Sequence, residues 1–464
     1  MSGVMYIDAW LHHAPRCASR AGSSFPRLSS QNLQRPCYHV RKSFSNLSHA
    51  PFTGAAVTSP FISQCHKFRA EYDQAVSLST RVLQLGTSEL EYERIRVSRE
   101  FENSNPSVDR ENWLEHSIKN FRERITSQVF TDNTKLNAAA KYVLSAKSKL
   151  FRPRLGLMVA RLLYARITTE GAYQATGADS NNLSSLSGSD AIMSGDLLER
   201  IMRLLQSYEI VHVGSLVHDD ILDNAKTRRG LPTVHVKMGT KIATLVGDLM
   251  LTRACSTVAK LGSQQLTLRM AKALENLIKG ELMQVEGTDT ADVMLCDYLK
   301  KIFLKTASPI AECCASIADL LRQDESVRHR CYLIGLHVGM AFQIYDDLLD
   351  YRSSSTDLGK PTLNDLSSGL ITMPLLMALP ESPELESLLT DGTVSAGKVD
   401  IVLPFVNSSH AFARSQCAVM MHLAEVSRLL RCLDSKEAAP ESPLSESAQT
   451  LLRFIYDTLT RSTG

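Results

Sequence analysis

Two aspartate-rich segments constrain this chain more than any other feature. Each holds two adjacent aspartates and a third one three residues later: Asp219-Asp220-Ile221-Leu222-Asp223 and Asp346-Asp347-Leu348-Leu349-Asp350. On an α-helix, side chains four residues apart share one face, so the outer carboxylates of each segment point the same way. Such like charges repel each other. Mg²⁺ bound to an anionic substrate would offset this repulsion, because it is commonly held by one or two carboxylates plus phosphates. The segments therefore predict a diphosphate clamped between two helices.

Basic residues follow each aspartate segment. Arg228 and Arg229 come shortly after Asp223, and Lys360 lies in a Gly-Lys-Pro turn after Asp350. The planar guanidinium of arginine suits bidentate recognition of phosphate. One isolated aspartate segment would more often be a solvated acidic turn or a helix cap. With acids and bases in both halves of the chain, a metal-bridged phosphate site is the better interpretation.

The composition indicates an all-α protein with a large core. Hydrophobic residues make up 44% of the 464 residues, and stretches from about Asn112 onward have the periodicity of amphipathic helices. Strand patterns with hairpin signals are scarce. The net charge of +2 argues against a nucleic-acid partner. The ten cysteines form no C-x-x-C pair, so we expect neither a zinc site nor a disulfide framework. No apolar run reaches the roughly 18 residues that a membrane span needs.

The N-terminus has the composition of an organelle transit peptide. Its first 50 residues hold six Lys or Arg, nine serines and one acid, Asp8, and basic, serine-rich, acid-poor segments are typical of such peptides. A disordered basic tail is the alternative. We expect residues 1–60 to be the transit segment, 61–111 a peripheral extension, and 112–464 the catalytic domain. A serine- and glycine-rich stretch at 171–195 is predicted to be a flexible insertion.

Further motifs occur in the order typical of one enzyme family. They are Phe151-Arg152-Pro153, Glu209-x-x-His212, Arg228-Arg229-Gly230, Gly280-Glu281-x-x-Gln284, Lys305-Thr306, and Phe342-Gln343 before the second aspartate segment. With these motifs, residues 112–464 resemble the all-trans polyprenyl diphosphate synthases, relatives of farnesyl and geranylgeranyl diphosphate synthases. The resemblance implies an isoprenoid synthase-type bundle of helices around a deep central cavity, with the aspartate segments on facing helices at its mouth. Helical bundles build metal sites in this way.

The resemblance also implies the reaction. An allylic diphosphate, farnesyl or geranylgeranyl, ionises, the double bond of isopentenyl diphosphate attacks the carbocation, and a proton is lost. Three Mg²⁺ ions, which Mn²⁺ could replace, would counter the charge that develops on the departing diphosphate.

Site residues follow from their positions in the family's motifs. The expected metal ligands are Asp219, Asp223, Asp346 and Asp350, supported by Asp220 and Asp347. The expected isopentenyl-diphosphate pocket comprises Lys149, Arg152, His212 and Arg229. The expected allylic-diphosphate site comprises Arg228, Lys305, Thr306, Gln343 and Lys360, of which Lys305, Thr306 and Gln343 also face the carbocation as catalytic groups. A lone histidine is more often a core residue, but His212 lies about two helical turns before Asp219 and so on the same face.

Two departures from the short-chain relatives concern the substrate loop and the product. The family usually has Gly-Gly-Lys-Arg-x-Arg-Pro where this chain has Lys-Ser-Lys-Leu150-Phe-Arg-Pro, so we expect a stiffer loop. Short-chain relatives place an aromatic residue five positions before the first aspartate, as the floor of the cavity. Gly214, followed by Ser215, occupies that position here. A growing tail would pass these residues, which predicts a long product, with geranylgeranyl diphosphate as the alternative.

A transit segment and a long product together suggest a mitochondrial enzyme that makes the side chain of ubiquinone; a plastid-type organelle is the alternative. The family implies a homodimer or a heteromer with a related subunit, and a lipid product allows peripheral association with membranes. Two other functions compete. A non-catalytic subunit would have lost its aspartates, which are complete here. A terpene cyclase would carry a different second metal motif and would need no isopentenyl-diphosphate pocket.

Overall fold

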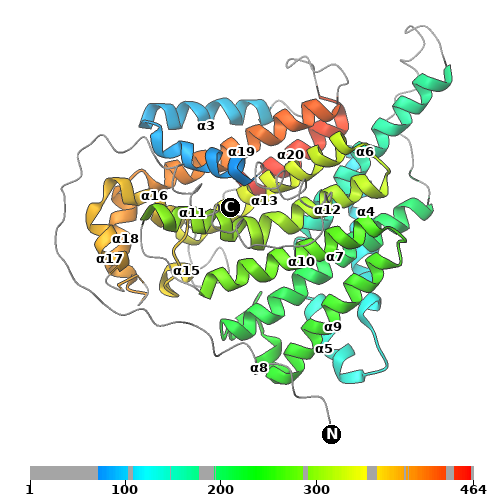
Figure 1. Cartoon of the computed structure of the whole chain (residues 1–464), viewed down its shortest axis with the longest axis horizontal. Coiled ribbons are helices and arrows are strands. Elements are labelled where there is room, and N and C mark those ends of the chain that lie inside the picture. The colour runs from blue at the N-terminus through cyan, green and yellow to red at the C-terminus, as the bar shows by residue number, and fades with distance from the viewer. Residues whose placement is uncertain are drawn as a thin grey trace, which may run out of the picture. The chain divides into compact units, whose positions relative to one another are not determined.

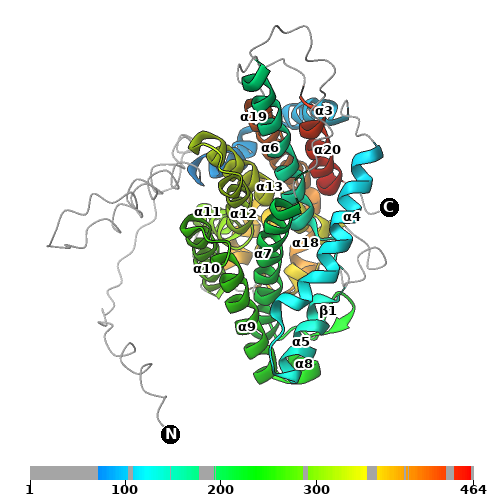
Figure 2. The same cartoon turned by 90° about the vertical axis from the view of Figure 1, so that its right-hand side faces the viewer.

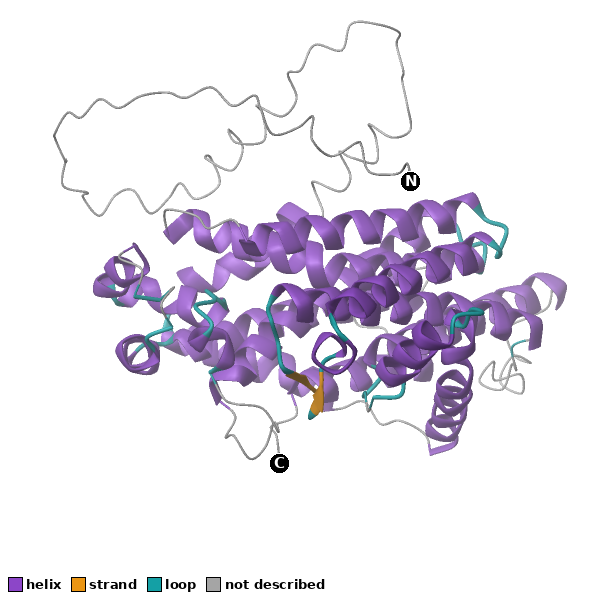
Figure 3. Cartoon of the chain, turned by 90° about the horizontal axis from the view of Figure 1, so that it is seen from below, coloured by secondary structure: helices purple, strands orange, loops and turns teal. Residues whose placement is uncertain are grey.

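Helices build almost the whole of the described chain. The computed structural model describes residues 72–102, 108–146, 148–176, 193, 195–285, 291–352, 363–390, 393–394, 397–434 and 444–460. Residues 59–464 form one compact unit. In the part described, the only strands are β1 (Thr227–Arg228) and β2 (Leu231–Pro232), an antiparallel hairpin beside the helices (Figure 3). The predicted all-α fold is confirmed.

The helices alternate with short connections. In chain order, after a helix at 72–81, they are η2 (Val82–Gln84), α3 (Thr87–Glu102), α4 (Val108–Ile125), η3 (Thr126–Val129), α5 (Thr134–Leu144), α6 (Phe151–Thr176), α7 (Gly195–Leu222), α8 (Val234–Met238), α9 (Thr240–Ala259), α10 (Gln264–Val285), α11 (Ala291–Ile302), η6 (Phe303–Ala307), α12 (Ser308–Leu320), α13 (Glu325–Arg352), α15 (Asn364–Ser367), α16 (Met373–Ala378), η7 (Leu379–Glu381), α17 (Pro383–Thr390), α18 (Val399–Ser408), α19 (Ala411–Asp434) and α20 (Glu446–Thr460).

Helices α7 and α13 are the long central elements, and each carries one aspartate segment near its C-terminal end. Helix α12 packs against α13 and α10, α7 against α9, and α13 against α19 (Figures 1 and 2). Both central helices are buried along much of their length, which explains why their sequences show a weak amphipathic pattern.

Two predicted boundaries need correction. Helix α6 continues to Thr176 and α7 begins at Gly195, so helix occupies both ends of the stretch predicted as an insertion at 171–195. The intervening residues 177–192 lie outside the described residues, as does the predicted transit segment at 1–60.

The extension predicted to be peripheral, residues 61–111, contributes to the core in its described part. Ala75, Val82 and Val97 are fully buried, and α3 packs against α19. The hydroxyl of Tyr72 donates to the carbonyl of Cys296 in α11 at 3.2 Å. The prediction failed because the partners of these apolar side chains come from distant parts of the chain.

A buried chain of polar groups also ties this extension to α19 and α13. The hydroxyl of Ser79 donates to the carbonyl of Ala75, so its oxygen is the acceptor for His422 Nε2 at 2.8 Å. His422 Nδ1 then accepts from His337 Nδ1 at 2.9 Å. This order leaves His337 Nε2 unprotonated, and that buried nitrogen has no hydrogen-bond partner. Burial lowers the pKa of His337 to about 3, so the pair remains neutral near pH 7.

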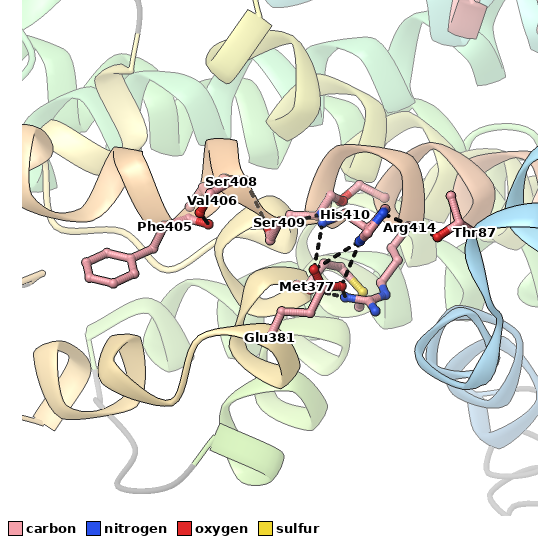
Figure 4. A network of polar contacts seen from close by, with 11 residues as sticks. Thr87, Met377, Glu381, Phe405, Val406, Ser408, Ser409, His410 and Arg414 are labelled. Carbon is pink, nitrogen blue, oxygen red and sulfur yellow. Dashed lines mark hydrogen bonds and ion pairs between the residues drawn. The ribbon is translucent and has the colours of Figure 1, made fainter.

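A second polar contact joins the start of α3 to the C-terminal helices (Figure 4). Glu381 accepts hydrogen bonds from the backbone nitrogen and from Nδ1 of His410, at 3.1 and 3.0 Å. His410 Nε2 lies 3.2 Å from the hydroxyl of Thr87, and Arg414 pairs with Glu381 from the next turn of α19. Residues 72–102 are therefore fixed to the bundle by polar contacts as well as apolar ones.

Helix α9 differs from the expectation that no segment could span a membrane. This helix is long and apolar enough to cross a membrane, by length and composition only, and a third of it is buried. The sequence criterion missed it because Asp248 and Arg253 interrupt the apolar run. One such helix is a weak indication, since core helices of soluble proteins have the same composition.

Candidate active site

One short π-helical segment connects the two aspartate helices. The ammonium of Lys305 lies 3.3 Å from Asp219 Oδ2 on α7 and 2.5 Å from Glu281 Oε2 on α10. The hydroxyl of the next residue, Thr306, donates to Gln343 Oε1 on α13 at 2.8 Å. Adjacent residues of η6 therefore contact both helices that carry aspartate segments. π-Helical turns are rare and frequently occur at functional sites.

Glycines on both sides allow η6 to lie close to its neighbours. A Cβ on Gly280 of α10 would lie 2.8 Å from the backbone nitrogen of Lys305, and one on Gly339 of α13 would lie 2.4 Å from the Cα of Ala307. Any larger residue would push the segment away. These contacts fix the backbone from which Lys305 and Thr306 project.

The acids of the first segment are crowded and partly buried. Burial raises the pKa of Asp219 to about 6, although Lys305 opposes the shift, and the charge of Glu281 adds to it. Burial also raises the pKa of Asp223, which again lies in the field of Glu281. Carboxylates held this close together favour an added cation. Within the described ranges, no group of three or more His, Cys, Asp or Glu is arranged so that it could hold a metal.

The middle aspartates are engaged by protein donors. Arg228 Nε donates to Asp220 Oδ1 at 2.6 Å. Asp347 accepts from the hydroxyl of Tyr298 at 2.6 Å and from Gln343 Nε2 at 2.8 Å, and burial raises its pKa to about 7. Two of the outer aspartates are engaged as well: Asp219 is buried beside Lys305, and Asp350 accepts from the backbone nitrogen of Asp365 at 3.1 Å. The outer residues Asp223 and Asp346 are exposed.

Two of the predicted isopentenyl-diphosphate residues, Arg152 and Arg229, lie in the electrostatic field of a buried carboxylate, Glu209. Burial lowers the pKa of Arg152, whose guanidinium lies in the fields of Glu209, Arg229 and Asp346. Burial raises the pKa of Glu209, while Arg152 and Arg229 oppose that shift. Burial and the same two arginines lower the pKa of His212 far below its ordinary value. Near pH 7 His212 is a neutral imidazole between cationic groups, which suits a hydrogen bond to an anion.

The structure distributes these side chains over two neighbouring pockets. Arg152, His212, Lys305 and Thr306 line the first, whose apolar walls come from α6, α7, α10 and α12. Asp220, Arg228 and Arg229 line the second, between α5, α7 and the β-hairpin. The cavity volume of the first pocket is only about 20 Å³, close to that of one water molecule. The expected deep cavity is narrow here, so a prenyl tail requires side chains to move.

The predicted product-length residues lie elsewhere. A Cβ on Gly214 would meet Met250 and Leu251 of α9, at 3.3 and 3.4 Å, and neither Gly214 nor Ser215 lines the first pocket. Ser215 is buried, and its hydroxyl donates to the carbonyl of His212 at 2.9 Å. That face of α7 packs against α9, so a tail would pass Gly214 only after side chains of α9 had moved. Tyr208 contributes to the pocket wall instead, about three turns before Asp219.

The remaining predicted residues are less engaged. Lys149 is exposed, and its carbonyl accepts from Arg154 Nε at 3.1 Å. Leu150, which stands where the family has an arginine, adopts a φ of 50°, a conformation that L-residues rarely take. Lys360 lies outside the described residues.

Two contacting residues were not assigned to the site from the sequence. Glu281 pairs with Lys305, and its motif with Gly280 had been recognised without a role. Tyr298 contacts Asp347. It precedes Lys305 by seven residues, about two helical turns, and that spacing was the available signal.

These features define the class of the protein. It has an isoprenoid synthase-type fold, a helical bundle in which two aspartate-bearing helices contact the segment that carries Lys305 and Thr306. In agreement, heptaprenyl diphosphate synthase from Staphylococcus aureus superposes with a TM-score of 0.61 at 22% identity, covering 75% of this chain and 98% of that one.

Sequence comparison then identifies the family. The polyprenyl synthetase family model matches residues 133–403. Solanesyl-diphosphate synthase 1, mitochondrial, from Oryza sativa subsp. japonica is 31% identical over 73% of this chain and 75% of that protein. Probable hexaprenyl pyrophosphate synthase, mitochondrial, from Neurospora crassa is 31% identical over 77% of this chain and 82% of that protein. The chain belongs to the polyprenyl synthetase family, which is a family of prenyltransferases.

Proposed function

We propose that this chain is a magnesium-dependent synthase that condenses isopentenyl diphosphate with farnesyl or geranylgeranyl diphosphate to make a long all-trans polyprenyl diphosphate. The observation that carries the proposal is the position of η6 between the two aspartate helices, here called the η6 bridge. Lys305 contacts Asp219 while Thr306 contacts Gln343. One turn of helix therefore contacts both halves of the proposed diphosphate site. A reaction limited by charge on a leaving diphosphate needs such convergent groups.

The metal would be held by the outer aspartates Asp219, Asp223, Asp346 and Asp350, with Asp220 and Asp347 in support. The crowding that raises the pKa of Asp219 and Asp223 favours an added cation. Bound there, Mg²⁺, as three ions or replaced by Mn²⁺, supplies Lewis-acid stabilisation of the departing diphosphate.

The other side chains bind and orient the substrates. Arg152, Arg229 and neutral His212 would hold isopentenyl diphosphate, and Lys149 would reach it from the exposed loop. Lys305 keeps its proton: burial tends to lower its pKa, but Asp219 and Glu281 outweigh that effect and raise it. Its ammonium can therefore donate to the allylic diphosphate, together with Arg228 and Lys360. The allylic C–O bond breaks, the isopentenyl double bond supplies the electron pair of the new C–C bond, and a proton leaves the adduct.

The oxygens of Thr306 and Gln343 would face the carbocation. Both are neutral groups with their negative ends available, and they lie on elements fixed by close glycine contacts. Preorganised dipoles of this kind stabilise developing charge without reorganisation.

The cellular role is inferred from the relatives and the N-terminal composition. The named relatives in rice and Neurospora crassa are a solanesyl and a probable hexaprenyl synthase, both mitochondrial. We infer a mitochondrial enzyme with a long product that serves as a ubiquinone side chain. Geranylgeranyl diphosphate synthase is the second candidate, favoured by the narrow pocket.

The test is an incubation of the full chain with Mg²⁺, labelled isopentenyl diphosphate and farnesyl diphosphate, followed by dephosphorylation and sizing of the products. We expect a ladder that ends at one long prenyl alcohol. A ladder that stops at geranylgeraniol would select the second candidate. Absence of incorporation by folded protein would contradict both and point to a missing partner subunit.

Tyr208 is predicted to limit the product length. Its ring lines the apolar end of the pocket, and its hydroxyl bonds to Ser316 Oγ at 2.9 Å. Tyr208→Ala removes the ring and opens space beyond it, so the main product should become longer by one or more isoprene units. The product ladder measures this. Gly214→Ala, which points toward α9, is the control and should leave the length unchanged; an unchanged product of Tyr208→Ala would place the floor elsewhere.

We also propose that α9 and α10 pair with a second subunit, a copy of this chain or a related one. Their outward faces expose Leu245, Leu268, Ile278 and Leu282 by 46–64%, and clustered large apolar side chains usually mark an interface. Ile278→Glu with Leu282→Glu should convert a dimer into a monomer in sedimentation experiments. A wild-type chain that sediments as a monomer would contradict this. Leu268 and α9 could alternatively rest on a membrane, which liposome flotation would detect.

A further inference from the structure

Tyr298 is a buried tyrosine of α11 that points toward the second aspartate segment. It is 4% exposed, and its hydroxyl donates to Asp347 Oδ2 at 2.6 Å. A tyrosine hydroxyl carries its proton at neutral pH. It is therefore a permanent donor to this carboxylate.

The bond from Tyr298 is the first of three that lead to the substrate pocket. The second oxygen of Asp347 accepts from Gln343 Nε2 at 2.8 Å, and Gln343 Oε1 accepts from the hydroxyl of Thr306 at 2.8 Å. Thr306 lines the pocket that also contains Lys305 and His212. A relay of hydrogen bonds thus runs from α11 through α13 to η6.

The chemistry of the acceptor fixes the direction of this relay. Gln343 turns its NH₂ group to Asp347 and its carbonyl to Thr306, the orientation that an ionised Asp347 requires because a carboxylate only accepts. Tyr298 occupies the other oxygen and so prevents the carboxylate from turning. The orientation of two groups at the pocket therefore depends on a residue that does not touch it.

A simpler reading is that Tyr298 is only a buried tyrosine with a satisfied hydroxyl, as most are. Two observations go further than that. Both oxygens of Asp347 are used within the relay, and the relay ends on a pocket-lining hydroxyl instead of on backbone.

We propose that Tyr298 is a positioning residue for prenyl transfer, which acts through Asp347 and Gln343 to orient Thr306 and the carbonyl of Gln343 in the pocket. This role rests on the proposed function. It assigns Asp347, the middle aspartate of the second segment, to side-chain orientation.

The kinetic test compares Tyr298→Phe and Thr306→Val, two changes at opposite ends of the relay. Each should lower kcat roughly tenfold to hundredfold, as expected for a lost hydrogen bond to a charged or reacting group, and leave both KM values within about twofold. Because both break one relay, the double variant should lose little more than either single variant. Multiplicative losses in the double variant would overturn the proposal.

Tyr72→Phe is the matched control. It removes a partly buried tyrosine hydroxyl that contacts α11, at the carbonyl of Cys296, and leaves the relay intact. It should lower thermal stability about as much as Tyr298→Phe does, without a change in kcat. An equal fall in kcat for Tyr72→Phe would mean that Tyr298 acts only through the stability of α11.

A structural readout separates this inference from the proposed function. Crystal structures of the wild type and Tyr298→Phe should show Gln343 or Thr306 in altered rotamers in the variant, whether or not the chain makes polyprenyl diphosphates. Unchanged rotamers would overturn the relay, while an inactive wild type would overturn the proposed function. If Tyr298→Phe does not fold, Asp347→Asn tests the relay from its middle, because asparagine has one acceptor oxygen where the carboxylate has two. Either the hydroxyl of Tyr298 or the amide of Gln343 must then change from donor to acceptor.

Discussion

Asp219→Asn is expected to lower kcat about a thousandfold, the largest loss from any single substitution considered for this chain. The side chain is one of the outer carboxylates and is the one that Lys305 contacts, at 3.3 Å. Asparagine keeps the shape and removes the charge that would hold a cation. Charge stabilisation by a metal is worth several kcal/mol, and about 4 kcal/mol corresponds to a thousandfold. Steady-state kinetics at saturating Mg²⁺ measure the loss.

The same substitution should make the metal-free protein more stable at pH 7. Burial raises the pKa of Asp219 from 3.8 to about 6, so the folded state binds this proton more tightly than the unfolded state does. Stability of the wild type then falls as the pH rises from about 4 to 6, and the penalty is fully present above that range. Asparagine carries no such penalty. Urea denaturation in the presence of a chelator should show an advantage at pH 7 that disappears below about pH 4.

Asp196→Asn provides the control on the same helix. Asp196 is an exposed acid in the first turn of α7, so its loss should leave kcat unchanged and cost only a few tenths of a kcal/mol through the helix dipole. If Asp219→Asn retained activity close to that of Asp196→Asn, the first segment could not be the metal site.

The sequence predicted those parts of the site whose residues are close together in the chain. The four-residue spacing places Asp219 and Asp223 at the end of one helix, and the same spacing applies to Asp346 and Asp350. The closeness of Arg228 to the first aspartate segment also follows from a short loop. Helical periodicity and loop length are local properties, so they can be read without a structure.

Contacts between distant segments could not be predicted in this way. The face of α7 that carries Gly214 could point into the cavity or toward another helix, and only the packing of α9 decides between them. The extension at 72–102 looked peripheral because Ser79 and Thr87 meet their partners more than 300 residues later. Apolar and polar residues alone do not reveal which distant surface they will meet.

The η6 bridge depends both on a local motif and on contacts between distant segments. The motif Lys305-Thr306 was recognised from the sequence, but its contact with both aspartate helices depends on the glycines of α10 and α13. A motif therefore specified the chemical groups, while the close packing of three helices specified their position. The substitution of Gly339, which changes the packing and leaves the motif intact, tests this distinction directly.

Gly339→Ala is expected to reduce kcat about a hundredfold without altering any charged or polar group of the site. The added Cβ would lie 2.4 Å from the Cα of Ala307, and backbone cannot yield as a flexible side chain can. Helix α13 or η6 must move by about 1 Å, a displacement that can cost a hundredfold in rate when catalytic groups lose their alignment. Overpacking should also lower stability by roughly 1–3 kcal/mol. Kinetics and urea denaturation measure the two effects.

Two other glycines separate misplacement from general instability. Gly335→Ala creates a similar clash one turn earlier, 2.7 Å from the Cα of Ala311 in α12, and should lose comparable stability with a smaller fall in kcat. Gly195→Ala meets no atom within 4 Å and should be neutral in both measurements. If Gly335→Ala lost as much activity as Gly339→Ala, the rate would depend on the stability of α13 as a whole. A selective loss in Gly339→Ala would show that the position of Lys305 and Thr306 limits the reaction.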